Sequence, residues 1–178
     1  MNTESLKRRF LTYELGLLSL KAALPTRDKN WPIYVKSKKS HQRSKAKEAF
    51  RAILAEIDHK YLSGKVTEEA HTQYIVDVAD KLSSQLKDHL HRGRFRIGIS
   101  QKLVNVHLKY LWTDGLCPEP PHCPIDGIIR DIAKIDYDWM RSDCVNDYRQ
   151  AILSLKKAAD GLSLSVYELQ VFRRRDDK

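Results

Sequence analysis

The spacing of apolar residues limits what this chain can fold into, because they recur at steps of three and four residues along most of its length. That spacing is the period of one face of an α-helix, and no long stretch alternates apolar and polar residues as a half-buried strand does. The sequence therefore predicts an all-α fold. At 178 residues the chain has the length of one domain with a core, and we expect six or seven helices in residues 1–178.

Prolines, glycines and capping residues divide this pattern into separate helices. Pro25 ends the first helix, whose apolar face runs from Leu6 to Leu24, and Gly64 ends the second. Ser142 or Asp143 is expected to cap the helix that runs to Gly161, and Ser163 or Ser165 to start the last helix. The expected helices cover residues 4–24, 44–61, 67–90, 100–115, a segment that starts at residue 126, then 143–161 and 163–172.

Basic residues are concentrated at the N-terminal end. Residues 1–51 contain 13 Lys/Arg against 4 Asp/Glu, whereas residues 52–178 contain 19 of each, so the net charge of +9 arises entirely in the first part. Clustered cations favour an acidic partner, with nucleic acid ahead of a membrane surface, because they release counterions from a polyanion. The alternative is a solvated basic face without a partner.

Residues 26–44 are expected to form a basic loop or arm within this part. Lys36, Lys38 and Lys39 are predicted to contact phosphates there. Trp31 and Tyr34 precede them and allow two interpretations. Their rings either stack on bases or anchor the loop to the core.

Cysteine and histidine usage gives no indication of a disulfide framework or a metal. The three cysteines are odd in number and unevenly spaced, which is typical of a reduced, cytoplasmic protein. Cys117, His122 and Cys123 lack the paired spacing and the fourth ligand of a zinc site, so no metal and no cofactor are predicted. His71, His89 and His91 are interpreted as surface residues. Charged residues interrupt the first apolar segment, so neither a membrane-spanning helix nor a signal peptide is expected.

Residues 91–130 carry the candidate site. Ile97-Gly98-Ile99 is predicted to turn tightly between two helices, with Ser100 as the N-cap of the second. The free amides of its first turn would then face a phosphate. Asp126 follows a proline-rich loop and is predicted to cap the next helix. The predicted nucleic-acid contacts in this segment are Arg92, Arg94, Arg96, Gly98, Ile99, Ser100, Asn105 and Lys109.

Two stretches of this segment resemble the helix-hairpin-helix DNA glycosylases. Ile97-Gly98-Ile99-Ser100-Gln101-Lys102-Leu103-Val104-Asn105-Val106 is similar to that family's hairpin and second helix, where Leu-Pro-Gly-Val-Gly precedes Arg-Lys-Thr-Ala-Asn-Val. Pro124-Ile125-Asp126-Gly127-Ile128-Ile129-Arg130 resembles its Val-Asp-Thr-His-Val-x-Arg segment, and also small bacterial proteins described as having an 8-oxoguanine glycosylase fold. The resemblance covers roughly 40 of the 178 residues. It implies that Lys102 is the nucleophile and Asp126 the essential carboxylate.

Three functions follow as hypotheses. The first is a glycosylase or abasic-site lyase that acts on duplex DNA through Lys102 and Asp126. The second is a non-catalytic DNA- or RNA-binding module, favoured by the absence of a second hairpin glycine and by the long interval between Lys102 and Asp126. The third is an interaction or inhibitor protein whose basic N-terminal part docks on an acidic protein partner.

Overall fold

The computed structural model describes residues 2–24, 28–35 and 40–172, and within them it contains seven α-helices, two short 3-10 helices and no strand. The prediction of an all-α fold with six or seven helices is confirmed. The α-helices are α1 (Thr3–Ala23), α2 (Ser40–Tyr61), α3 (Glu68–Leu86), α4 (Ile97–Thr113), α5 (Gly127–Ala133), α6 (Val145–Ala158) and α7 (Leu164–Val171), and the 3-10 helices are η1 (Lys87–His89) and η2 (His91–Gly93).

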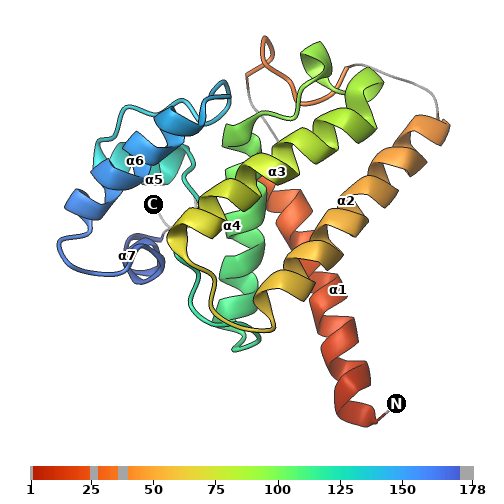
Figure 1. The fold of residues 1–178 in the computed structure, drawn as a ribbon, viewed down its shortest axis with the longest axis horizontal. Helices are drawn as coiled ribbons and strands as arrows, with labels where there is room; N and C mark the ends of the chain where they lie inside the picture. The colour runs from red at the N-terminus through yellow and green to blue at the C-terminus, as the bar shows by residue number, and fades with distance from the viewer. Residues whose placement is uncertain (1, 25–27, 36–39, 173–178) are drawn as a thin grey trace.

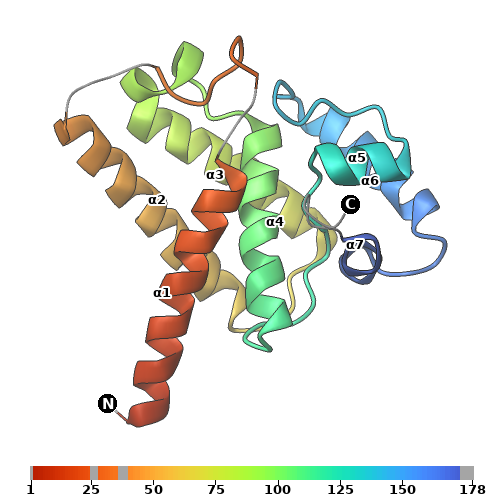
Figure 2. The ribbon, with the colours of Figure 1, turned by 180° about the vertical axis from the view of Figure 1, so that it is seen from behind.

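Helix α4 lies at the centre of the molecule. Helices α1 and α2 lie on one side of it, α5, α6 and α7 lie on the other, and α3 crosses it and also contacts α6 (Figures 1 and 2). Every residue from Ile97 to Leu108 is buried, including several polar ones. Leu103, Leu108 and Leu111 reach the middle of the core. The polar side chains near the start of α4 therefore need hydrogen-bond partners inside the protein.

Capping side chains set several of the helix starts. Thr67 Oγ1 accepts a hydrogen bond from Ala70 N at α3, and Ser163 Oγ accepts one from Val166 N at α7. These starts agree with the sequence-based boundaries. Helix α6 begins at Val145, after Cys144, because Asp143 bonds to α4 instead of capping its own helix. The prediction of Ser142 or Asp143 as the cap of this helix is wrong for that reason.

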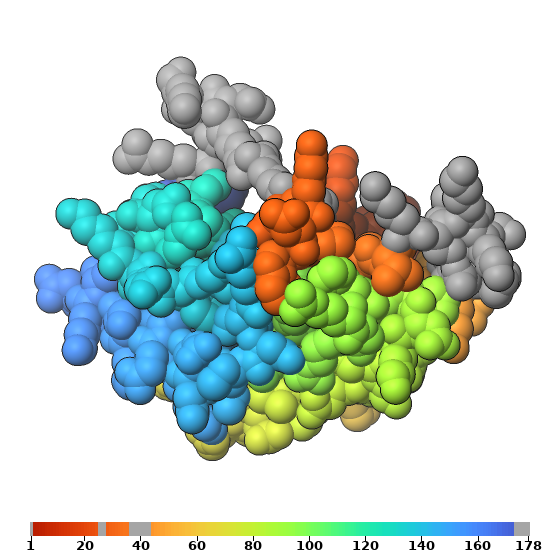
Figure 3. Space-filling model, turned by 90° about the horizontal axis from the view of Figure 1, so that it is seen from above, coloured from red at the N-terminus to blue at the C-terminus, as the bar shows by residue number. Residues whose placement is uncertain are grey.

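The segment 28–35 is pinned against the body of the protein. Ile33 is buried, Val35 N donates to His89 O, and His91 N donates to Ile33 O. Figure 3 shows this orange segment between the green residues near 90 and the blue residues near 140. The ring of Trp31 packs against His91 and three arginines, and that of Tyr34 against Phe50. Both rings thus act as anchors. Lys36, Lys38 and Lys39 lie outside the described residues.

Helix α1 packs on α4 through one face only. Ser19 and Ala23 are buried on that face, whereas the N-terminal end of the helix extends beyond the other helices (Figures 1 and 2). Four apolar residues of its opposite face are 39% to 66% exposed, namely Leu6, Phe10, Tyr13 and Leu17. In the parts of the chain that the structure describes, no helix has both the length and the apolar composition needed to cross a bilayer.

Candidate functional site

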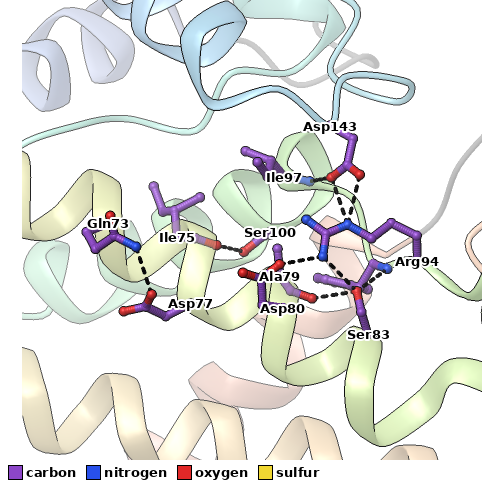
Figure 4. Close-up of polar contacts among 11 residues, drawn as sticks. Gln73, Ile75, Asp77, Ala79, Asp80, Ser83, Arg94, Ile97, Ser100 and Asp143 are labelled. Atoms are coloured by element: carbon purple, nitrogen blue, oxygen red, sulfur yellow. Dashed lines mark hydrogen bonds and ion pairs between the residues drawn. The ribbon is translucent and has the colours of Figure 1, made fainter.

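The tight turn that was predicted at residues 97–99 does not form. Helix α4 begins at Ile97, with Arg96 in the N-cap position, so Ile97-Gly98-Ile99 is its first turn rather than a bend between helices. Ser100 is completely buried, and its Oγ donates to Ile75 O of α3 at 2.6 Å (Figure 4). The predictions of a tight turn at residues 97–99 and of Ser100 as an N-cap are therefore wrong.

Protein atoms occupy the place where the first turn of α4 was expected to hold a phosphate. Ile97 N donates to Asp143 Oδ1 at 3.1 Å, and Gly98 N donates to Ser142 O at 2.9 Å. A Cβ atom on Gly98 would lie 2.0 Å from Trp139 O, so only glycine allows the segment to approach this closely. The segment that contains Trp139 and Asp143 thus takes the role that was predicted for an anion.

Two of the three arginines before α4 also bind groups of the protein itself in place of a phosphate. Arg94 Nη1 lies 2.5 Å from Asp80 Oδ1, and its Nε lies 2.8 Å from Asp143 Oδ2, as Figure 4 shows. Arg96 is 4% exposed and donates to the carbonyl oxygens of Trp31, Pro32 and Met140. Burial lowers the pKa of its guanidinium. These side chains join distant segments to α4.

Arg92 differs from its two neighbours because it is exposed. Its guanidinium carbon lies 4.4 Å from the centroid of the Trp31 ring, a cation-π contact at the surface. Of the three predicted phosphate-binding arginines, Arg92 alone keeps a solvent-facing position.

Asn105 belongs to a buried polar network and does not reach the surface. Its Oδ1 lies 2.8 Å from His71 Nε2, and its Nδ2 donates to Tyr148 Oη at 3.2 Å. The hydrogen-bonded network extends further at both ends: Tyr61 Oη lies 2.6 Å from His71 Nδ1, and Tyr148 Oη lies 2.7 Å from His122 Nδ1. Asn105 was predicted to contact nucleic acid, and this position is occupied by internal partners instead.

The bonding pattern defines which ring nitrogen of His71 carries the proton. The amide oxygen of Asn105 can only accept, so His71 carries its proton on Nε2 and accepts from Tyr61 at Nδ1. Burial lowers the pKa of His71 to about 3 and that of His122 to about 4. Both rings are therefore neutral near pH 7. His71 is fully buried, so its interpretation as a surface residue is wrong, and His89 and His91 are partly buried.

Gln101 positions the loop that carries Asp126, a role that sequence reasoning missed. Its Nε2 donates to Ile125 O at 2.7 Å, and Ile125 N donates to its Oε1 at 3.1 Å. This pair of bonds fastens the residue before Asp126 to the centre of α4. The sequence does contain an indication of this role. Gln101 and Asn105 are two amide residues four positions apart, which places them on one face of the helix.

Lys102 and Asp126 come together despite the long loop between them. Lys102 Nζ lies 3.9 Å from Asp126 Oδ2 and 4.2 Å from the centroid of the Trp139 ring, and the lysine is 8% exposed. Asp126 Oδ1 meanwhile accepts from Ile128 N and Ile129 N, which confirms the prediction that Asp126 caps its helix. One carboxylate oxygen is held by the cap and the other faces the amine.

This pair opens into a cavity of about 340 Å³ between α4, α7 and the start of α5. Lys109, which was predicted to contact nucleic acid, also lines the cavity, and its Nζ lies 2.7 Å from Glu168 Oε2. Burial raises the pKa of Glu168, partly offset by Lys109. Glu168 and Phe172 complete the wall from α7 and were not identified from the sequence. Two ion pairs, Lys102 with Asp126 and Lys109 with Glu168, thus line the cavity.

A second group of side chains has the composition of a hydrolase triad but is structural. His107 Nε2 lies 2.8 Å from Asp58 Oδ1, and its Nδ1 lies 2.9 Å from Ser19 Oγ. Ser19 and His107 are fully buried, and Ser19 Oγ also bonds to Leu15 O at 2.7 Å. A nucleophile needs access to its substrate. These bonds instead join α1 and α2 to α4.

Neither protein-family models, nor curated proteins, nor solved structures gave a match to this chain. Within the described ranges, no group of three or more His, Cys, Asp or Glu residues is arranged to hold a metal ion. Cys117 and Cys123 are buried, and His122 Nδ1 lies 2.7 Å from Tyr148 Oη. The geometry around Lys102 and Asp126 is therefore the basis for assigning a function.

Proposed function

We propose that the protein acts on nucleic acid as an abasic-site lyase or DNA glycosylase, with Lys102 as the amine nucleophile and Asp126 as its carboxylate partner. The observation that carries this proposal is the 3.9 Å separation of Lys102 Nζ and Asp126 Oδ2 at the wall of a cavity. A cavity of about 340 Å³ falls within the range of roughly 300–1,000 Å³ that small-ligand sites occupy. An extruded nucleotide is such a ligand.

The chemistry assigns one task to each group. At an abasic site, Nζ adds to C1′ of the open-chain sugar aldehyde, and loss of water leaves an imine. Removal of a proton from C2′ then breaks the C3′–O bond, and the phosphate leaves. On an intact nucleotide, the bond from C1′ to the base breaks as the amine adds, and the base takes up a proton. Asp126 Oδ2 accepts the amine proton, while the cap holds Oδ1 in place.

The proposed approach of the duplex differs from that of the hairpin family. The first-turn amides of α4 are bonded to Ser142 and Asp143, so they do not hold a phosphate. Lys109 at the cavity, the exposed Arg92 and the basic residues of the first 51 positions are the cations that we assign to the phosphates. Lys36, Lys38 and Lys39 remain part of this proposal.

Borohydride trapping tests the proposal directly. An imine between Lys102 and abasic DNA is reduced to a stable amine, so the protein incubated with abasic duplex and borohydride should give a covalent protein-DNA band. Lys102→Ala should abolish the band, whereas Lys157→Ala, an exposed lysine on α6, should leave it unchanged. Asp126→Asn retains an oxygen for the cap but loses the proton acceptor, so it should slow the band without weakening DNA binding.

The burial of Lys102 favours a second candidate, a nucleic-acid-binding module without catalysis. At 8% exposure and in contact with the ring of Trp139, this amine has little access to a sugar in a duplex. The absence of both an adduct and base release from a panel of damaged duplexes would support that candidate. The binding module itself predicts an affinity for DNA that falls steeply as the salt concentration rises. A salt-independent affinity would exclude both candidates.

A further inference from the structure

The outer face of α1 presents a row of apolar side chains to solvent. Leu6, Phe10, Tyr13 and Leu17 are 50%, 66%, 49% and 39% exposed. The opposite face of the helix packs through Ser19 and Ala23. In Figure 2, α1 runs beside α4 and crosses in front of α2, and no other helix lies in front of α1. Single exposed apolar residues are ordinary, but a continuous row on one helix marks a surface that binds another molecule.

The spacing of this row favours a second copy of the chain as its partner. The four residues follow one another at steps of four, three and four, which is the alternation of the two seam positions in a helix pair. The row is also symmetric about the point between Leu11 and Thr12. When two copies of α1 run antiparallel about a twofold axis at that point, Leu6 lies opposite Leu17 and Phe10 lies opposite Tyr13.

The charges beside the row fit the same arrangement. Lys7 and Glu14 are seven residues apart and therefore lie along the same edge of the row. In the twofold arrangement this edge of one α1 lies beside the same edge of the other α1, and the two run in opposite directions. Lys7 of each copy therefore lies near Glu14 of the other. On the opposite edge, Gly16 is buried against Leu54 of α2 and Tyr13 accepts a hydrogen bond from Arg51 of α2, so α2 borders the row on that side.

We propose that the protein forms a symmetric dimer in which two copies of α1 pair in antiparallel orientation through Leu6, Phe10, Tyr13 and Leu17. The seam is short, so the dimer dissociates on dilution. Ala22 near the end of α1 also lines the cavity of Lys102 and Asp126. Dimerisation through α1 therefore fixes the two cavities of the dimer relative to each other. This inference does not depend on the proposed activity.

Sedimentation velocity of the full chain over a hundredfold range of concentration tests the dimer. The wild-type protein should shift from monomer to dimer as its concentration rises. Phe10→Glu combined with Leu17→Glu should remain monomeric throughout, because four carboxylates would meet in the seam. Leu18→Glu replaces an apolar residue of α1 that is 47% exposed but lies outside the row, and it should dimerise like the wild type. Circular dichroism should show the same helix content in all three.

Charge exchange tests the orientation of the two helices. Lys7→Glu alone and Glu14→Lys alone should each weaken the dimer at low salt, since each places like charges together. The double variant should restore it, because the pair is reversed but kept. A parallel pair would not show this rescue, because Lys7 and Glu14 of different copies would then lie about 10 Å apart along the axis.

Three results would overturn the inference. The first is a wild-type protein that stays monomeric at every concentration. The second is a dimer that survives Phe10→Glu with Leu17→Glu. The third is a monomer that binds vesicles of anionic lipid through the same row, shown by loss of vesicle binding in that double variant, because the row would then face a membrane.

Discussion

Helices α4 and α1 both depart from the usual distribution of side chains: α4 buries polar residues, and α1 exposes apolar residues to solvent. Ser100, Gln101, Asn105 and His107 of α4 are polar and completely buried, whereas α1 leaves apolar residues such as Phe10 half or more exposed. Both helices have the same period of apolar residues in the sequence. The difference teaches that hydropathy ceases to predict burial where polar atoms find internal partners, and where apolar atoms lie on the face that we propose to bind a second copy.

Hydrogen bonding explains how α4 tolerates its polar residues. Asn105 bonds to His71 and Tyr148, and Gln101 bonds to both backbone groups of Ile125. Buried polar groups with partners cost little, whereas a single unpaired group costs about 1–3 kcal/mol. The residues of α4 are thus interdependent, while those on the outer face of α1 are independent of one another within one chain. This contrast leads to three predictions of decreasing size.

The largest effect is expected at Gly98. In Gly98→Ala the new Cβ would lie 2.0 Å from Trp139 O, an atom of the backbone that cannot rotate away, so α4 and the segment after Trp139 must separate. We expect a loss of more than about 4 kcal/mol in the free energy of unfolding, measured with denaturant. Gly127→Ala is the matched control. A Cβ there meets nothing within 4 Å, and we expect a change of less than about 1 kcal/mol.

The buried histidines should make stability fall in acid. Burial lowers the pKa of His71 to about 3 in the folded protein, against about 6.5 when unfolded. Between these values the unfolded chain binds the extra proton, so stability is constant above pH 6.5 and declines as the pH falls toward 4. His71→Gln should remove up to about 1.4 kcal/mol per pH unit from that slope.

The control for this pH measurement is His59→Gln, which changes an exposed histidine in the last turn of α2 and should leave the slope as it is. Denaturant unfolding at several pH values between 7 and 4.5 gives both slopes. An unchanged slope in His71→Gln would mean that the ring is solvated or charged in the folded protein, contrary to the bonds with Tyr61 and Asn105.

The smallest expected changes in stability give the most direct comparison between the buried network of α4 and the exposed face of α1. Tyr148→Phe removes the hydroxyl that joins Asn105 to His122, and it should cost about 1–3 kcal/mol because both partners remain buried. Phe10→Ser on α1 should change the stability of the monomer by less than about 0.5 kcal/mol. Thermal unfolding at low protein concentration compares them. Equal losses would contradict the contrast between the two helices.

The all-α class, several helix starts and the cap at Asp126 were predictable because they depend on local patterns. The proximity of Lys102 and Asp126 was expected from the family resemblance, and the structure places them in one cavity. The start of α4 was not predictable, because its partners are distant. Ser142 and Asp143 lie more than 40 positions beyond Gly98 and Ile97, and the carbonyls that Arg96 binds come from Trp31 and Pro32.

His71 was misread because a lone polar residue on a helix is usually solvated. Its burial becomes evident only when Tyr61, Asn105 and Tyr148 from three other helices surround it. These contacts are tertiary, so no pattern of residue spacing along the sequence predicts them. Glu168 and Phe172 were missed for the same reason, since α7 reaches the cavity only through tertiary packing.

The covering of Gly98 by Ser142 also bears on how the protein is made. A ribosome adds roughly 5–20 residues per second, so Ser142 is synthesised about 2–9 s after Gly98. Until then the amides of Ile97 and Gly98 have no partner from residues 142 and 143, and Arg94 has only Asp80 and Ser83 of the side chains that it binds in the finished molecule. The nascent chain thus carries an unfinished central helix, and the arrival of residues 139–143 is the event that completes it.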